Sequence, residues 1–197
     1  MKAFFGMFRR SAGELKSVRC LAVTGILLAV FVVLRSYTSI QFGTVVRINF
    51  AFLALAAIAM LYGPVVAMIA AIPGDVLSAI ILGGGPSGLL PGLTLVWVFN
   101  GLVYGVFLYR FELKKSFWSN ARLIIAHAMV VFIGRMVLNT SILYYYGILG
   151  ADGSTVQTLI SVRVITNLVA FPIDLAVLYL MLVPIKLAYM KTIGRQI

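Results

Sequence analysis

The stretch Gly83-Gly84-Gly85-Pro86-Ser87-Gly88-Leu89-Leu90-Pro91-Gly92-Leu93-Thr94-Leu95 separates two strongly apolar segments of the chain. Seven of its thirteen residues are Gly or Pro. Glycine costs backbone entropy in a helix and proline lacks an N–H donor, so neither flanking helix continues through the stretch. It therefore predicts a connector between two membrane helices. The second helix is expected to begin at Pro91, because proline suits a first helical turn.

Two interpretations of this connector stay open: a mobile lid over a small-molecule site, or a plain turn between helices. The connector lacks the Gly-Lys-Ser/Thr ending of a nucleotide-binding loop, and the chain has no lysine between Lys16 and Lys114. We therefore expect no phosphate site here. The residues of the candidate lid are Gly83, Gly84, Gly85, Pro86, Ser87, Pro91 and Gly92.

The composition is that of a membrane protein. Of the 197 residues, 62% are hydrophobic, and the mean hydropathy is +1.10. Only 11% of the residues are charged, whereas a soluble domain carries roughly 25%. We expect an all-α integral membrane protein that crosses the cell membrane several times, with residues 1–197 forming a single domain.

Six apolar segments are predicted to form transmembrane helices, since crossing the hydrocarbon takes about 20 mostly apolar residues. They are residues 20–34, 48–62, 65–82, 91–109, 123–146 and 156–184. The basic residues gather in residues 1–19, in residues 110–122 and after residue 184, which such a bundle places on one side. The positive-inside rule then puts both termini in the cytoplasm, with residues 1–19 as a basic cytoplasmic segment and the connector outside. This topology accounts for the net charge of +11, so we expect no nucleic-acid partner.

Polar side chains lie in the outer halves of the last three predicted helices. Arg163 and Asn167 are four residues apart, which places them on one face of the last helix. A charge in hydrocarbon is costly unless it has a partner or a function. The combination of arginine, amide and aromatic groups predicts an outward-facing pocket for a flat, polar, anionic ligand. The candidate substrate-binding residues are Arg163, Asn167, Asn139, Trp97, Thr94, Arg35, Arg47 and Arg135.

Several of these residues have a purely structural alternative. Arg135 is also positioned to pair with Asp75 or Asp174. Arg47 is also able to reach lipid headgroups, and Trp97 fits a space-filling role between helices. The sequence has no paired-carboxylate motif, His-rich metal set or Ser/His/Asp arrangement, so we expect no enzymatic activity, no cofactor and no metal.

Small residues recur at four-residue spacing, which lets helices approach closely in a membrane. The motifs are Gly25-x-x-x-Ala29, Gly63-x-x-x-Ala67 and Gly101-x-x-x-Gly105. Some of them are expected to serve packing inside the protein. Because the chain has no nucleotide site, a partner must supply the energy if the protein transports a solute against a gradient.

Motifs spread over residues 21–182 match one known family. They include Val46-Arg47-Ile48-Asn49-Phe50, Tyr62-Gly63-Pro64, Gly74-Asp75, Leu138-Asn139-Thr140 and Arg163…Asn167…Pro172. The most specific is Leu90-Pro91-Gly92-Leu93-Thr94-Leu95, which closes the glycine-rich connector. With these motifs the sequence resembles the substrate-binding S components of energy-coupling factor (ECF) transporters. It is most similar to the folate-type family, which tends to have Phe-Pro-Gly-Phe-Thr-Leu at residues 90–95.

The resemblance implies a six-helix subunit that captures a vitamin, folate in the first place, from outside with high affinity. It also implies docking on a transmembrane scaffold subunit that two cytoplasmic ATPase subunits energise. The family's small-residue docking motif, commonly Ala-x-x-x-Ala, falls on Gly25 and Ala29. Folate suits the candidate site, because its flat pterin matches Trp97, Asn139 and Asn167 and its carboxylates match the arginines. An S component for another planar vitamin or a nucleobase-like precursor, a non-transport membrane scaffold protein and an intramembrane enzyme remain as alternatives.

Overall fold

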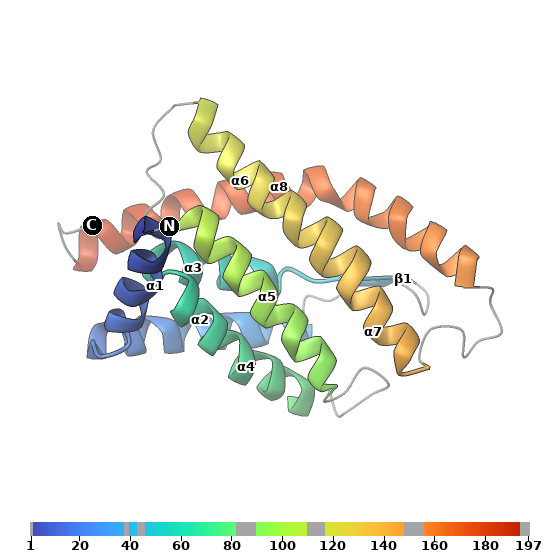
Figure 1. Cartoon of the computed structure of the whole chain (residues 1–197), viewed down its shortest axis with the longest axis horizontal. Helices are drawn as coiled ribbons and strands as arrows, with labels where there is room; N and C mark the ends of the chain where they lie inside the picture. Colours follow the sequence, from blue (N-terminus) through green and yellow to red (C-terminus); the bar gives the residue numbers. More distant parts are fainter. Residues whose placement is uncertain are drawn as a thin grey trace.

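The computed structural model describes residues 2–37, 40–42, 46–81, 90–109, 117–147 and 156–193. The described part consists of helices and one short antiparallel hairpin, in which Gln41 lies opposite Arg47. The elements are α1 (Lys2–Glu14), α2 (Val18–Tyr37), β1 (Ile40–Phe42), β2 (Val46–Ile48), α3 (Ala51–Tyr62), α4 (Pro64–Ile81), α5 (Pro91–Leu108), α6 (Phe117–Met129), η1 (Val130–Leu138), α7 (Asn139–Tyr145) and α8 (Val156–Ile193). The segment η1 is a π-helix, and α6, η1 and α7 follow one another without a break (Figure 1).

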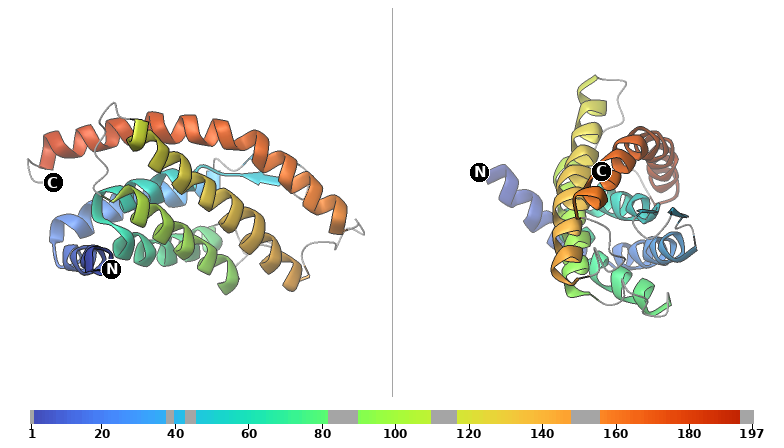
Figure 2. Two further views of the ribbon diagram at one scale, coloured as in Figure 1. Left: turned by 45° about the horizontal axis from the view of Figure 1, so that its top comes forward. Right: turned by 90° about the vertical axis from the view of Figure 1, so that its right-hand side faces the viewer.

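The long helices run between two ends of an elongated bundle (Figures 1 and 2). One end, called here the terminal end, holds α1, the junction of α3 with α4, and the end of α8. The other, called here the hairpin end, holds β1 and β2, the ends of α4 and α7, and the starts of α5 and α8. Both chain termini therefore lie at the same end of the bundle.

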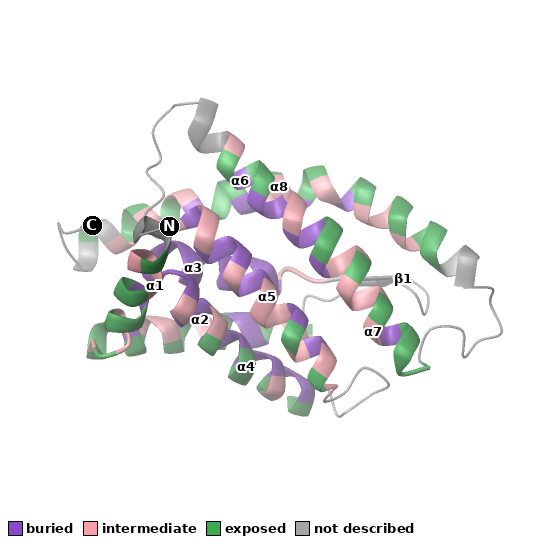
Figure 3. Ribbon diagram, viewed as in Figure 1, coloured by how far each residue is buried: buried purple, intermediate pink, exposed green. Residues whose placement is uncertain are grey.

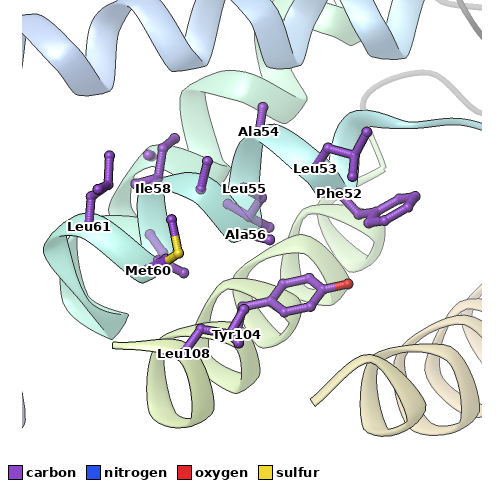
Figure 4. Close-up of a cluster of buried hydrophobic side chains, with 14 of the residues drawn as sticks. Phe52, Leu53, Ala54, Leu55, Ala56, Ile58, Met60, Leu61, Tyr104 and Leu108 are labelled. Atoms are coloured by element: carbon purple, nitrogen blue, oxygen red, sulfur yellow. The ribbon is translucent and has the colours of Figure 1, made fainter. Parts of the chain in front are cut away.

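Helix α3 forms the centre of the fold. All twelve of its residues are buried, and α2, α4, α5 and α8 contact it. A helix that is apolar all round is buried on every side, as α3 is here. Figure 4 shows its side chains meeting Tyr104 and Leu108 of α5, and Figure 3 contrasts the buried α3 with the exposed residues of α8.

Each predicted segment contains a helix, but several limits differ. Helix α1 was not predicted, α6 begins at Phe117 rather than at residue 123, and α8 continues to Ile193 rather than ending at residue 184. The second segment also differs. That helix was expected to begin at residue 48, but β2 extends to Ile48 and α3 begins at Ala51. It ends at Tyr62, and the next residue, Gly63, has a φ of +90°, a left-handed conformation that favours glycine. Among the described residues, five helices are long and apolar enough to cross a membrane, and α3 is a shorter apolar helix. Apart from the short hairpin, the described part of the protein is thus helical, and several of its helices are apolar and long enough to span a membrane.

The small-residue motifs divide into internal and external ones. A Cβ atom added to Gly105 would lie 2.2 Å from the Cα atom of Pro64, and one added to Gly101 would lie 3.0 Å from the carbonyl carbon of Ala67. These residues therefore hold α5 tightly against α4. At Gly25 of α2, by contrast, an added Cβ meets nothing within 4 Å. The residues Gly63 and Ala67 are buried, so only the Gly25 motif of the three presents a free surface within the described part of the chain.

Candidate functional site

A carboxylate joins three helices near the hairpin end. Asp75 of α4 is buried, with 2% of its surface exposed. Its Oδ1 atom accepts a hydrogen bond from the Arg35 guanidinium of α2. Its Oδ2 atom accepts a hydrogen bond from the Thr94 hydroxyl of α5 at 2.5 Å. The Arg35 guanidinium lies over the ring of Trp97, 5.2 Å from its centre. We call Arg35, Asp75, Thr94 and Trp97 the Asp75 cluster. It brings together three of the predicted site residues and holds their side chains in fixed positions.

Aromatic packing surrounds this cluster. Phe31 meets Trp97 edge-on, with ring centres 5.0 Å apart. Phe31 also packs on Gly74, where an added Cβ would lie 2.9 Å from the Phe31 ring. Glycine at position 74 therefore lets the Phe31 ring lie against α4 directly beside Asp75. Trp97 does fill space between helices, as one interpretation of the sequence proposed, and it also supports Arg35.

A second group of predicted residues meets between α7 and α8. Arg163 Nη1 donates to Asn139 Oδ1 and to Thr140 Oγ1, both at 3.2 Å. The Asn167 side chain donates to the backbone oxygen of Arg163 at 2.9 Å. The Nε atom of Arg163 is buried and has no hydrogen-bond partner. We call Arg163, Asn139, Thr140 and Asn167 the Arg163 cluster.

Arg135 belongs to a third, deeper group. Its Nη1 atom lies 2.6 Å from Asp174 Oδ2, and its guanidinium lies over the Phe52 ring. His127, which is fully buried, hydrogen-bonds through Nδ1 to the Tyr104 hydroxyl at 3.0 Å, and its Nε2 atom lies 3.9 Å from Asp174. Internal pairing with Asp174 was one of the two alternatives for Arg135, and it is the arrangement found. A direct ligand role for Arg135 stays a prediction.

The charges of the spanning helices explain why Arg163 differs from the other two arginines. Arg35 pairs with Asp75 and Arg135 pairs with Asp174. Within the described residues, Arg163 contacts only neutral side chains, through its hydrogen bonds to an amide and a hydroxyl oxygen. A half-buried cation without a carboxylate partner is an unfavourable arrangement unless an anion binds. Arg163 is therefore the strongest candidate in this region for holding an anionic group.

The first two clusters lie on neighbouring helices. The start of α5 packs on α7, since a Cβ added to Gly92 would lie 2.7 Å from Ile142 Cγ2. Thr94 follows Gly92 by two residues and Asn139 opens α7, so both clusters face the hairpin end of the bundle.

Pro91 and Gly92 are the first residues of α5, as expected. Arg47 lies in β2, which contacts α8. The other candidate lid residues, Gly83, Gly84, Gly85, Pro86 and Ser87, lie outside the described residues.

The sequence interpretation left two contributors out of the site. Asp75 was considered as a partner for Arg135 and as part of the Gly74-Asp75 motif, and Thr140 only as part of the Leu138-Asn139-Thr140 motif, so neither was named as a site residue. A signal for Asp75 was available, because Asp75 and Asp174 are the only acidic residues inside the predicted apolar segments. Each of them requires a cation, and Arg35 was present to serve the first. The available signal for Thr140 was its place beside the candidate Asn139 in the Leu138-Asn139-Thr140 motif.

The π-helix η1 carries Arg135 of the deeper group and leads directly into Asn139 of the Arg163 cluster. It covers Val130–Leu138 and contains Gly134, whose Cα approaches α5 so closely that an added Cβ would lie 2.4 Å from Asn100 Oδ1. Arg135 and Asn139 both contact side chains of α8, Asp174 and Arg163 respectively. Single π-helical turns inside longer helices are frequent at functional sites.

Comparison with known proteins gives consistent results. The profile of the family described as "ECF transporter, substrate-specific component" matches residues 19–183. The folate transporter FolT of Leuconostoc mesenteroides subsp. mesenteroides is 31% identical over 159 residues, which are 80% of this chain and 83% of that protein. The folate transporter FolT of Clostridium novyi is 29% identical over 166 residues, or 84% of this chain and 88% of that protein.

A solved structure has the same fold. It is described as the crystal structure of FolT bound with folic acid, and it matches with a TM-score of 0.70 at 24% sequence identity. The match covers 92% of this chain and 97% of the other. Since the family profile also spans most of the sequence, the chain belongs to the substrate-specific components of ECF transporters.

Proposed function

We propose that this chain is the high-affinity substrate-binding subunit of an ECF-type vitamin importer and that its vitamin is folate. The observation that carries the ligand assignment is the 31% identity over 159 residues to the folate transporter FolT of Leuconostoc mesenteroides subsp. mesenteroides. The relative from Clostridium novyi has the same name. The chain covers 83% and 88% of these two proteins, so the similarity extends over nearly all of each.

The two clusters near the hairpin end support a ligand of this chemistry. Folate has a flat pterin and a glutamate tail with carboxylates. Arg163 offers a buried Nε donor to a carboxylate, and Asn139 and Asn167 beside it supply amide groups. Trp97 and Arg35 offer a stacked aromatic and cationic surface, to which Thr94 is joined through Asp75. Arg47 and Arg135 complete the proposed substrate-binding set.

The proposed topology has six spanning helices, with both termini in the cytoplasm and the hairpin end outside. Helix α3 is the sixth span although its twelve residues extend only about 18 Å. Because its neighbours bury every residue of α3, the helix need not match the thickness of the bilayer itself. The basic residues of the terminal end support this orientation through the positive-inside rule. The protein would then reside in the cell membrane with its site open to the exterior.

The glycine-rich residues 83–87 are proposed to act as a lid over this site. They connect Ile81 at the end of α4 to the residues before α5, and both helices carry members of the Asp75 cluster. A connector of this composition restricts the chain little, because glycine has no Cβ. Closure over the ligand would exclude water from the ion pairs.

The partners proposed are a transmembrane scaffold subunit and two cytoplasmic ATPase subunits. The ATPase subunits would supply the energy for transport, because the sequence of this chain contains no nucleotide-binding motif. The surface proposed for docking is the Gly25 and Ala29 face of α2. Both residues are exposed, and nothing lies within 4 Å of a Cβ added to Gly25. A smooth surface of small residues allows another helix to approach closely within a membrane.

A binding screen on the purified chain tests the proposal. Thermal unfolding is measured with folate, other planar vitamins such as riboflavin, and free nucleobases, and hits are confirmed by calorimetric titration. We expect folate to raise the unfolding temperature and the other compounds to leave it unchanged. A response to another planar vitamin without one to folate would assign the chain to that ligand instead. A folded protein that responds to none of these would favour a membrane scaffold role.

A further inference from the structure

Helix α1 lies across the bundle rather than along it. In the view down the long axis it projects sideways from the other helices (Figure 2). It is joined to α2 by only Leu15, Lys16 and Ser17, through a hydrogen-bonded turn. Helix α2 is a candidate membrane span that begins at Val18, whose apolar side chain is 81% exposed. Because α1 is separated from this span by only three residues and runs across it, α1 is placed in the plane of the membrane surface.

A buried serine fixes this position. Ser11 Oγ donates to the backbone oxygen of Tyr62 at 2.7 Å and accepts from the backbone N–H groups of Val65 and Val66, at 3.1 and 3.4 Å. It thereby satisfies backbone groups at the junction of α3 and α4. Leu15 packs on the core beside it. Helix α1 is therefore attached to the bundle along one side, and its other sides remain open to the surroundings.

The open sides of α1 are apolar on one flank and basic on the next. Phe5 is 69% exposed, Arg9 is exposed beside it one turn later, and Arg10 is exposed further round the helix. Lys16 is exposed in the turn that follows, and Lys191 of α8 is exposed at the same end of the bundle. The one acidic residue before Asp75 is Glu14. An exposed phenylalanine beside arginines is the pattern of a helix that lies in a lipid interface.

We propose that α1 is an interfacial helix that binds anionic lipid headgroups, with Phe5 inserted among the acyl chains and Arg9 and Arg10 on the phosphates. The partner is a lipid surface because α1 lies at the edge of the membrane span and its exposed charges are positive. Arginine is suited to phosphate, since its planar guanidinium donates two parallel hydrogen bonds. Because Ser11 connects α1 to the start of α4, lipid binding also positions this junction.

The test uses the full chain reconstituted in nanodiscs. A bimane label is attached at Phe5→Cys in a Cys20→Ala background, and its quenching by brominated phosphatidylglycerol is compared with quenching by brominated phosphatidylcholine. One basic side chain near an anionic surface is worth about 1 kcal/mol, or about a fivefold preference. We expect phosphatidylglycerol to be preferred at residue 5 by about fivefold or more. The double variant Arg9→Gln/Arg10→Gln should bring the preference close to one.

A label at Tyr145→Cys serves as the matched control, because Tyr145 is 85% exposed at the opposite end of the bundle. Its lipid preference should not respond to the charges of α1. Three results would overturn the proposal: no quenching at residue 5 by either lipid, equal quenching by both lipids in the parent protein, or shielding of the label only after energy-coupling subunits are added. The last result would identify a protein as the occupant.

Discussion

Replacing Arg163 with alanine should weaken ligand binding strongly while the fold is retained. The guanidinium is held by Asn139 and Thr140 through Nη1, so its direction is set before the ligand arrives, and Nε remains unpaired. A hydrogen bond to a charged group contributes about 1.5–3 kcal/mol. Loss of one such interaction corresponds to a decrease in affinity of roughly 10- to 150-fold. No ion pair among the described residues is broken, so stability should change less than affinity.

Titration calorimetry with folate measures this effect on the purified parent and Arg163→Ala proteins. Arg163→Lys should restore the affinity only in part, because an ammonium group lacks the planar fork of donors. Lys191→Ala is the matched control: it removes the same charge from the same helix, about 42 Å away along the axis. At physiological salt, charges are screened over about 8 Å, so this control should bind as the parent does.

Two outcomes would refute the reasoning. Parent-like affinity of a well-folded Arg163→Ala protein would show that the ligand does not contact this guanidinium. An equal decrease in Arg163→Ala and Lys191→Ala would show that net charge, rather than a local contact, determines affinity.

The other predictions concern docking, energy supply, the lid and packing. Gly25→Trp should abolish cellular uptake and copurification with partner subunits but leave folate affinity unchanged, whereas Leu180→Trp, also on an exposed surface, should permit transport; transport by the Gly25 variant would place docking elsewhere. The purified chain should hydrolyse no ATP, and activity that survives further purification would contradict the proposed role. Replacing residues 83–85 with alanines should slow both association and dissociation of folate in stopped-flow measurements, and unchanged rates would favour a plain turn. Gly105→Ala should destabilise the protein by about 1–3 kcal/mol because its Cβ would overlap Pro64, while Gly25→Ala should not; equal unfolding temperatures would contradict the close packing of α4 and α5.

Much of the fold could be predicted from the sequence because its signals are local. Apolar length, Gly and Pro positions and the distribution of basic residues are properties of short segments. They correctly indicated an all-helical membrane protein and most of the helix limits. They were wrong at the start of α3, where an apolar stretch including Ile48 forms a strand, because short apolar runs do not distinguish helix from strand.

Part of the candidate site was also visible in the sequence. Spacing correctly placed Arg163 and Asn167 on one face of the last helix, where the Asn167 side chain donates to the Arg163 backbone oxygen. The cost of a charge in hydrocarbon identified the arginines as residues needing partners. What spacing could not supply was the choice of partner. Arg35 and Asp75 are 40 residues apart in the chain, and Arg135 and Asp174 are 39 apart, so their pairing depends on which helices become neighbours.

The sequence by itself determined that this chain is a bundle of apolar helices with polar groups near one end, since burial of apolar surface and the cost of unpaired charge act on any arrangement of these residues. Only the tertiary structure decided which of Arg35, Arg135 and Arg163 pairs with a carboxylate among the described residues. Packing pairs Arg35 and Arg135 with carboxylates and places Arg163 beside an amide and a hydroxyl. It likewise decided that Gly105 is internal and Gly25 external, because a small side chain permits close approach without specifying the neighbour.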